Sequence, residues 1–121
     1  MARIMVVDDS PTDVQNLKNM LSKAGYAVVE ATSGLDAIAR IKQEKPDCVI
    51  MDVVMPGING FQATRTLSKD PSTAHIPVLV ISSKSQETDR VWALRQGARD
   101  YIVKPVKEAD LIAKVKTAIG A

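Results

Sequence analysis

Acidic, hydroxyl and basic side chains directly follow four short apolar segments of this chain. The residues at these four positions are Asp8 and Asp9, Asp52, Ser82 and Ser83, and Lys104 with Pro105. Carboxylates, a lysine and a hydroxyl are the groups that could together hold a hard cation and a phosphoryl group. Whether they can act together depends on whether the intervening elements bring them to one place.

The apolar segments are short, continuous and partly β-branched, which is typical of strands buried on both faces of a sheet. They predict strands at residues 4–7, 26–31, 48–51, 78–81 and 101–103. The segments between them have the apolar spacing of helices. Ser10 and Pro11 are suited to begin the first helix, and Gly25 to end it.

Apolar residues at helical spacing also predict the other four helices. Leu35, Ile38 and Ile41 define the second, and Phe61, Thr64 and Leu67 the third. The fourth is expected at residues 87–96 and the fifth at residues 108–119. In the fourth helix we expect Val91 and Leu94 to face inward and Trp92 to be partly exposed.

Five strand–helix units in strict alternation predict an α/β fold with a doubly wound parallel sheet. The flavodoxin-like strand order 2-1-3-4-5 fits best, with residues 1–121 forming one domain and no output domain. In such sheets function gathers at the carboxyl ends of the strands, beside the switch point between strands 1 and 3. Asp8, Asp9 and Asp52 should therefore meet in one shallow pocket, with Lys104 and Ser82 beside them.

Composition excludes several function classes. The 121 residues include 16 basic and 14 acidic side chains, a balance without basic runs that does not favour nucleic-acid binding. Apolar runs of four residues are far below the ~18 expected of a membrane span. Neither a signal peptide nor membrane insertion is expected. One cysteine, Cys48, and one histidine, His75, exclude a disulfide framework and a His-rich metal site, and we expect a cytoplasmic protein.

Three neighbouring carboxylates repel one another unless some are protonated or a cation lies among them. Oxygen ligands without His or Cys favour a hard cation, and a few carboxylates with room for water suit Mg²⁺ better than a caged Ca²⁺. A carboxylate can also attack a phosphoryl group. Lys104 would then supply a second cation and Ser82 a hydrogen-bond donor to a phosphoryl oxygen.

Plainer interpretations exist for each residue alone. Asp8 or Asp9 could cap a helix, although Ser10 already fills that position. Asp52 could be an ordinary loop residue, and Lys104-Pro105 could simply end a strand. The functional interpretation depends on all of them lying at one edge of the sheet.

Two other functions on the same fold fit less well. A phosphohydrolase with Asp52 as covalent nucleophile would need a second acid and a cap over the substrate, and Val54 offers no acid. A flavin or nucleotide binder would need a Gly-rich or Ser/Thr-rich phosphate loop after the first strand. Asp8 and Asp9 at that position would repel phosphate.

Several motifs in order give the whole chain a family resemblance. They are residues 6–10 (VVDDS), 51–57 (MDVVMPG) with Gly60, 76–78 (IPV) leading to Ser82, and 97–101 (GARDY) leading to Lys104-Pro105. With these motifs the chain resembles the receiver domain of bacterial two-component response regulators, of the CheY type. Residues 59–65, 86–92 and 96–101 are similar to the PilH-type single-domain regulators of twitching motility.

The resemblance implies a role for each matching residue around the acidic pocket. Asp52 would be the phosphoacceptor and, with Asp9 and the backbone carbonyl of Val54, a direct ligand of Mg²⁺. Asp8 would hold the metal through water. Lys104 would contact the phosphoryl group.

The remaining matches concern backbone shape and signalling. The peptide bond from Lys104 to Pro105 would be cis, and Gly60 would permit a tight entry into the third helix. Ser82 and Tyr101 would be the switch pair, reshaping the surface of the fourth helix, fifth strand and fifth helix. The expected partners are a chemosensory histidine kinase and a downstream motility protein, bound by a monomer.

Two positions depart from the usual pattern of the family. Val54 is apolar where many relatives carry a polar side chain, and Ser83 replaces a common alanine. Ser83 also leaves open whether it or Ser82 is the switch hydroxyl. Both positions bear on how long a phosphoryl group would survive.

Overall fold

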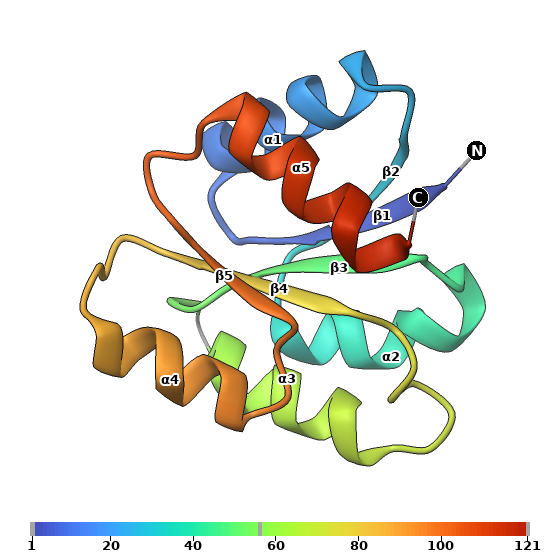
Figure 1. The fold of residues 1–121 in the computed structure, drawn as a ribbon. Coiled ribbons are helices and arrows are strands. Elements are labelled where there is room, and N and C mark those ends of the chain that lie inside the picture. The colour runs from blue at the N-terminus through green and yellow to red at the C-terminus, as the bar shows by residue number, and fades with distance from the viewer. Residues whose placement is uncertain (1, 56, 121) are drawn as a thin grey trace.

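The computed structural model describes residues 2–55 and 57–120 as five parallel strands and five helices in alternation (Figure 1). The strand order is β2-β1-β3-β4-β5, so the predicted doubly wound fold is confirmed. The strands are β1 Arg3–Val7, β2 Ala27–Ala31, β3 Cys48–Asp52, β4 Val78–Ser82 and β5 Asp100–Val103. The helices are α1 Pro11–Lys23, α2 Gly34–Glu44, α3 Gly60–Lys69, α4 Glu87–Arg95 and α5 Glu108–Ile119.

Helices cover both faces of the sheet, which explains why its strands are apolar without alternation. In Figure 1, α1 and α5 lie on one face, and α2, α3 and α4 on the other. Successive residues of β1 feed two separate cores, Ile4 toward α1 and α5 and Met5 toward the opposite helices. Cys48 is buried in the first of these cores, where desolvation raises the pKa of its thiol to about 12 and leaves it unreactive.

Side chains at the helix starts fix where the chain leaves the sheet. Ser10 accepts a hydrogen bond from the Asp13 backbone N–H at 3.4 Å, which confirms its predicted capping position before α1. Asn59 and Gln62 form a reciprocal capping box at the start of α3. Because the strands are parallel, these helix starts adjoin the carboxyl edge of the sheet.

Two strands extend one residue further at their carboxyl ends than predicted. Asp52 pairs with Ile81 as the last residue of β3, and Ser82 pairs with Val103 as the last residue of β4. Both side chains are therefore placed by the sheet ladder and not by the loops that follow. Pro56, in the loop motif after Asp52, lies outside the described residues.

Helix α4 differs from its prediction in the side that it buries. Val91 and Leu94, expected inward, are 38% and 39% exposed, whereas Ala93 is fully buried. The small Ala93 side chain lets the helix backbone lie close to the core, and the larger apolar residues fall on its flanks. Trp92 is 50% exposed, as predicted. At the start of α2, Leu35 is also exposed, and Ala37 is buried instead.

Within the described residues, no helix combines the length and apolarity needed to span a bilayer.

Gly60 begins α3 directly against the end of β3. Its N–H donates to the Val53 carbonyl at 2.9 Å. A Cβ atom at this position would lie 2.1 Å from the backbone oxygen of Asp52 and 2.8 Å from its carbonyl carbon. These are backbone atoms, so they cannot turn aside as a side chain could. The absence of a Cβ here lets α3 approach the residue that carries the central carboxylate.

Gly60→Ala should therefore lower the free energy of unfolding by about 3 kcal/mol, because the added methyl group must displace main chain. Urea unfolding measures the change. Gly25→Ala is the control: its positive φ of 93° strains alanine, but a Cβ there meets no atom within 4 Å. It should cost about 1 kcal/mol. Equal losses in the two variants would contradict the close-approach argument.

Candidate functional site

Three carboxylates meet at the carboxyl edge of the sheet. One oxygen from each of Asp8, Asp9 and Asp52 lies within 4.8 Å of the other two. The convergence follows from topology: β1 and β3 are neighbours, and Val7 at the end of β1 pairs with Met51, just before Asp52. Asp8 and Asp52 are buried, whereas Asp9 is exposed. The pocket thus has two desolvated acids at its base and one at its rim.

Asp8 is the most constrained of the three. Its Oδ1 accepts a hydrogen bond from the Ser10 backbone N–H at 2.9 Å, which orients the carboxylate. Its Oδ2 is buried and has no hydrogen-bond partner among the described residues. The nearest positive charge is the Lys104 ammonium, at 3.6 Å. A buried carboxylate oxygen without a partner is costly, so Asp8 is suited to an additional positive or hydrogen-bonding group.

Lys104 brings one positive charge to this acidic cluster. Its Nζ lies 3.1 Å from Asp52 Oδ1 and donates a hydrogen bond to Asp13 Oδ2 at 3.0 Å. The main chain beside it is fixed, because the Lys104 N–H donates to the Ser82 carbonyl at 2.8 Å. The peptide bond between Lys104 and Pro105 is cis, as the sequence resemblance implies.

Burial and crowding shift the ionisation of these groups. Desolvation raises the pKa of Asp8, outweighing the Ser10 hydrogen bond and the charge of Lys104. Desolvation and the neighbouring Asp8 charge likewise raise the pKa of Asp52, although Lys104 opposes the shift. Burial alone would lower the pKa of Lys104, but its bonds to Asp13 and Asp52 raise it. The cluster holds more negative charge than its lysine neutralises.

The donor set fits a hard divalent cation. All side-chain donors in the cluster are carboxylate oxygens, which Mg²⁺ prefers over the nitrogen and sulfur ligands of softer metals. The unpartnered Asp8 Oδ2 and the half-open rim at Asp9 leave polar atoms for an ion and its water. The geometry combines an acidic cation site, a buried carboxylate and a lysine directed at it.

Comparison with known families decides what this arrangement is. The model of the response regulator receiver domain matches residues 4–116. The chain belongs to the response regulator receiver domain family.

Relatives of this receiver domain span its whole length. It is 55% identical over 120 residues to Protein PilH of Pseudomonas aeruginosa, covering 99% of both chains. A putative response regulator of Chloroflexus aurantiacus has the same fold, with a TM-score of 0.95, 31% identity, and coverage of 99% and 98% of the two chains. The receiver domain of the sensor histidine kinase PA1611 of P. aeruginosa PAO1 matches with a TM-score of 0.90, 28% identity and 99% and 98% coverage. That neighbour has a magnesium ion coordinated in its active site cleft.

Two side chains of the receiver domain meet at the backbone of Lys84, in the loop after β4. The Lys84 N–H donates to Ser82 Oγ at 3.1 Å, and the Tyr101 hydroxyl donates to the Lys84 carbonyl at 2.8 Å. Ser82 and the Tyr101 ring are buried, and burial raises the pKa of the phenol. Ser83 is exposed, whereas Ser82 is buried.

The structure adds one residue to the site and separates another from it. Asp13, an acid in the first turn of α1, was not predicted at the site, yet its carboxylate holds the Lys104 ammonium. The sequence feature that could have indicated this contact is the position of Asp13 in the first turn of the helix that follows Asp8 and Asp9. The Val54 side chain is 68% exposed, and the role predicted for this residue involves its backbone carbonyl alone.

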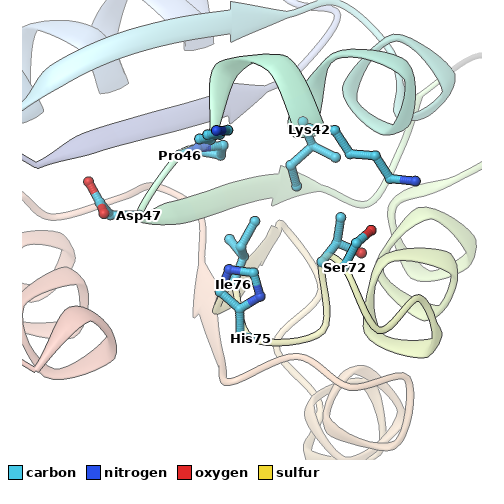
Figure 2. Close-up of a pocket in the computed structure, with 9 residues that line it drawn as sticks. Lys42, Pro46, Asp47, Ser72, His75 and Ile76 are labelled. Atoms are coloured by element: carbon cyan, nitrogen blue, oxygen red, sulfur yellow. The ribbon is translucent and has the colours of Figure 1, made fainter.

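A cavity of about 520 Å³ lies at the opposite end of the sheet (Figure 2). Its lining includes Pro46 and Asp47, which precede the first residue of β3, and His75. Figure 2 shows their side chains around a hollow beside Lys42, on α2. Asp52 is the last residue of the same strand. The carboxylate cluster is therefore separate from this cavity.

Asp8→Asn should increase the free energy of unfolding by about 1 kcal/mol at pH 7 without divalent ions, the scale of one unmatched buried polar group. Because desolvation raises the folded pKa of Asp8, its contribution to stability falls as pH rises from the ordinary value of 3.8 through the folded value. Removing the charge abolishes that loss. Urea unfolding at pH 7 with EDTA measures it.

Asp70→Asn is the control of opposite sign. Hydrogen bonds from Ser72 lower the pKa of Asp70, so its charge stabilises the folded chain above pH 3.8, and the variant should be less stable at neutral pH. A loss of stability in Asp8→Asn would show that its charge is not penalised.

Proposed function

We propose that this receiver domain accepts a phosphoryl group on Asp52 from a histidine kinase and thereby switches a partner-binding surface. The observation that carries the proposal is the juxtaposition of a buried carboxylate, two further acids and the Lys104 ammonium at one sheet edge. A phosphoacceptor needs a nucleophilic oxygen, a cation site beside it and a positive charge for the transferred group. The match to PilH over 99% of both chains supports a role like that of this relative.

In the transfer, a carboxylate oxygen of Asp52 attacks phosphorus and forms an O–P bond. The P–N bond to the kinase histidine breaks, and the imidazole leaves with the bonding electrons and takes up a proton. The protein catalyses only this self-phosphorylation and the slow hydrolysis of its product. Lys104, 3.1 Å from the attacking carboxylate, offers its ammonium to the incoming phosphoryl oxygens.

Mg²⁺ is the cofactor of this proposal, held by Asp9, Asp52 and the backbone carbonyl of Val54, with Asp8 contacting it through water. When bound, it would neutralise negative charge on the transferring phosphoryl group. Asp8 contributes a fixed orientation through its bond to Ser10, and its unpartnered Oδ2 is available to a water ligand.

The switch couples the phosphoryl group to Ser82 and Tyr101. Phosphorylation adds about −1.5 to −2 charges. The Ser82 hydroxyl can donate to a phosphoryl oxygen, which pulls on the loop that it shares with Tyr101 through Lys84. The Tyr101 ring, which is already buried, would then move with the Lys84 carbonyl that it bonds and reshape the surface formed by α4, β5 and α5. One local charge thereby biases a two-state surface.

The proposed partner of that surface is a downstream motility protein. Val91, Trp92 and Val103 are 38%, 50% and 40% exposed on α4 and β5 and supply apolar contact area. The 55% identity with PilH supports a chemosensory kinase upstream and control of type IV pilus twitching. We place the protein in the cytoplasm as a monomer that binds neither nucleic acid nor membrane.

Asp52→Asn should abolish acyl-phosphate formation, because the amide is not a nucleophile toward phosphorus. The test incubates the protein with acetyl phosphate and Mg²⁺ and measures the added mass of intact protein. Asp47→Asn, at the other end of β3, is the control and should be phosphorylated like wild type. Phosphorylation retained in Asp52→Asn would show that another residue is the acceptor.

The Asp9→Ala variant should need a more than tenfold higher Mg²⁺ concentration for the same yield of acyl phosphate, because it loses a proposed ligand of the metal.

Restoration of twitching tests the pathway. In a P. aeruginosa strain that lacks its own PilH, this chain should restore the twitching zone on agar, and Asp52→Asn should not. Equal expression of the two proteins is checked by immunoblot. Full restoration by Asp52→Asn would contradict signalling through phosphorylation, and failure of both proteins would contradict the pathway.

A further inference from the structure

Asp13 lies outside the carboxylate cluster but binds its lysine. The Lys104 ammonium donates to Asp13 Oδ2 at 3.0 Å, compared with 3.1 Å to Asp52 Oδ1 and 3.6 Å to Asp8 Oδ2. The shortest contact of this cation is therefore to α1 and not to the proposed acceptor. We propose that Asp13 is a positioning residue that competes with the phosphoryl group for Lys104. This inference rests on the proposed function.

The helix fixes Asp13 in place. It is the third residue of α1, and its backbone N–H is bonded to the Ser10 cap. The anchor cannot follow the lysine when a phosphoryl group extends the Asp52 side chain beyond its present oxygens. Lys104 must then reorient toward the new anionic oxygens, and the bond to Asp13 weakens as it does so.

The lysine has room to make this change. Asp13 and Lys104 both border a cavity of about 160 Å³ between α1 and the segment after β5. Leu17, Met20 and Val106 also line it, so the stem of Lys104 can adopt another rotamer against apolar side chains. The Lys104 side chain is 24% exposed and that of Asp13 is 41% exposed. The ion pair is therefore exposed enough for Lys104 to leave Asp13 and bind another anion, unlike an ion pair fixed in the core.

The competition has two opposite consequences. By holding Lys104, Asp13 lowers the affinity of the pocket for a phosphoryl group. By drawing the ammonium away from Asp52 and Asp8, it also leaves their oxygens more available to a divalent cation. Asp13 thereby shifts the balance between the affinity of the site for a divalent cation and its affinity for a phosphoryl group.

The test titrates beryllofluoride, a phosphoryl analogue that binds carboxylates, into the full chain at saturating Mg²⁺. Binding is followed by the amide NMR signal of Val53. Asp13→Asn should bind the analogue about two- to fivefold more tightly, the range that a half-exposed ion pair supports. Titration with Mg²⁺ alone should show weaker binding in the same variant.

Two control variants separate the ion pair from helix effects. Asp13→Glu keeps the charge and should restore wild-type affinity. Asp36→Asn removes an acid from the equivalent third position of α2, where it pairs with Arg40 at 3.3 Å, and should leave both titrations unchanged. Matching unfolding curves in urea establish that Asp13→Asn is folded.

A double-mutant cycle distinguishes competition for Lys104 from a general loss of negative charge. In the Lys104→Ala background, Asp13→Asn should no longer change the affinity for beryllofluoride. The same increase in both backgrounds, or none in either, would overturn the role of Asp13 and leave the proposed function intact. Failure of the wild-type chain to bind the analogue or to accept phosphate would instead overturn the proposed function, and this inference with it.

Discussion

The site is governed by an imbalance of charge at one edge of the sheet, where buried carboxylates outnumber the cation beside them. Asp8 and Asp52 are buried beside Asp9, and among the described residues one ammonium, that of Lys104, pairs with Asp8 and Asp52. Desolvation penalises each buried carboxylate, and their mutual repulsion adds to the penalty. The fold tolerates this cost because two apolar cores, one on each face of the sheet, hold the strands that carry the acids. The pocket is consequently disposed to accept positive charge.

The strand ends hold some site residues rigidly, whereas Lys104 and the loop after β4 can change their contacts. Asp52 and Ser82 end strands and are held by ladder pairs, and Gly60 brings α3 against the backbone of Asp52. Lys104 and the loop at Lys84 make contacts that side-chain or loop movement can exchange. In the proposed function, phosphorylation of Asp52 would be transmitted through these few hydrogen bonds, without rearrangement of either core.

The sequence predicted the sheet and the acidic pocket because both follow from strong local patterns. Continuous apolar blocks marked the strands, and parallel topology required that Asp8 and Asp52 meet. Apolar spacing failed for α4, where Val91 and Leu94 are exposed and the small Ala93 faces the core. A weakly amphipathic helix of nine residues offers no clear inner face, so packing decides which side is buried. The role of Asp13 was also missed, because a first-turn acid has an ordinary explanation in helix capping and dipole effects.

Ser82 and Tyr101 both form hydrogen bonds with main-chain atoms of Lys84. Ser82 accepts from the N–H of Lys84, and Tyr101 donates to its carbonyl, so the Lys84 side chain takes no part in either bond. Any amino acid with a backbone N–H could therefore occupy position 84 and preserve the connection, whereas proline would sever the bond to Ser82. The charge and bulk displayed at position 84 can therefore differ between relatives while the two hydrogen bonds beneath it stay the same.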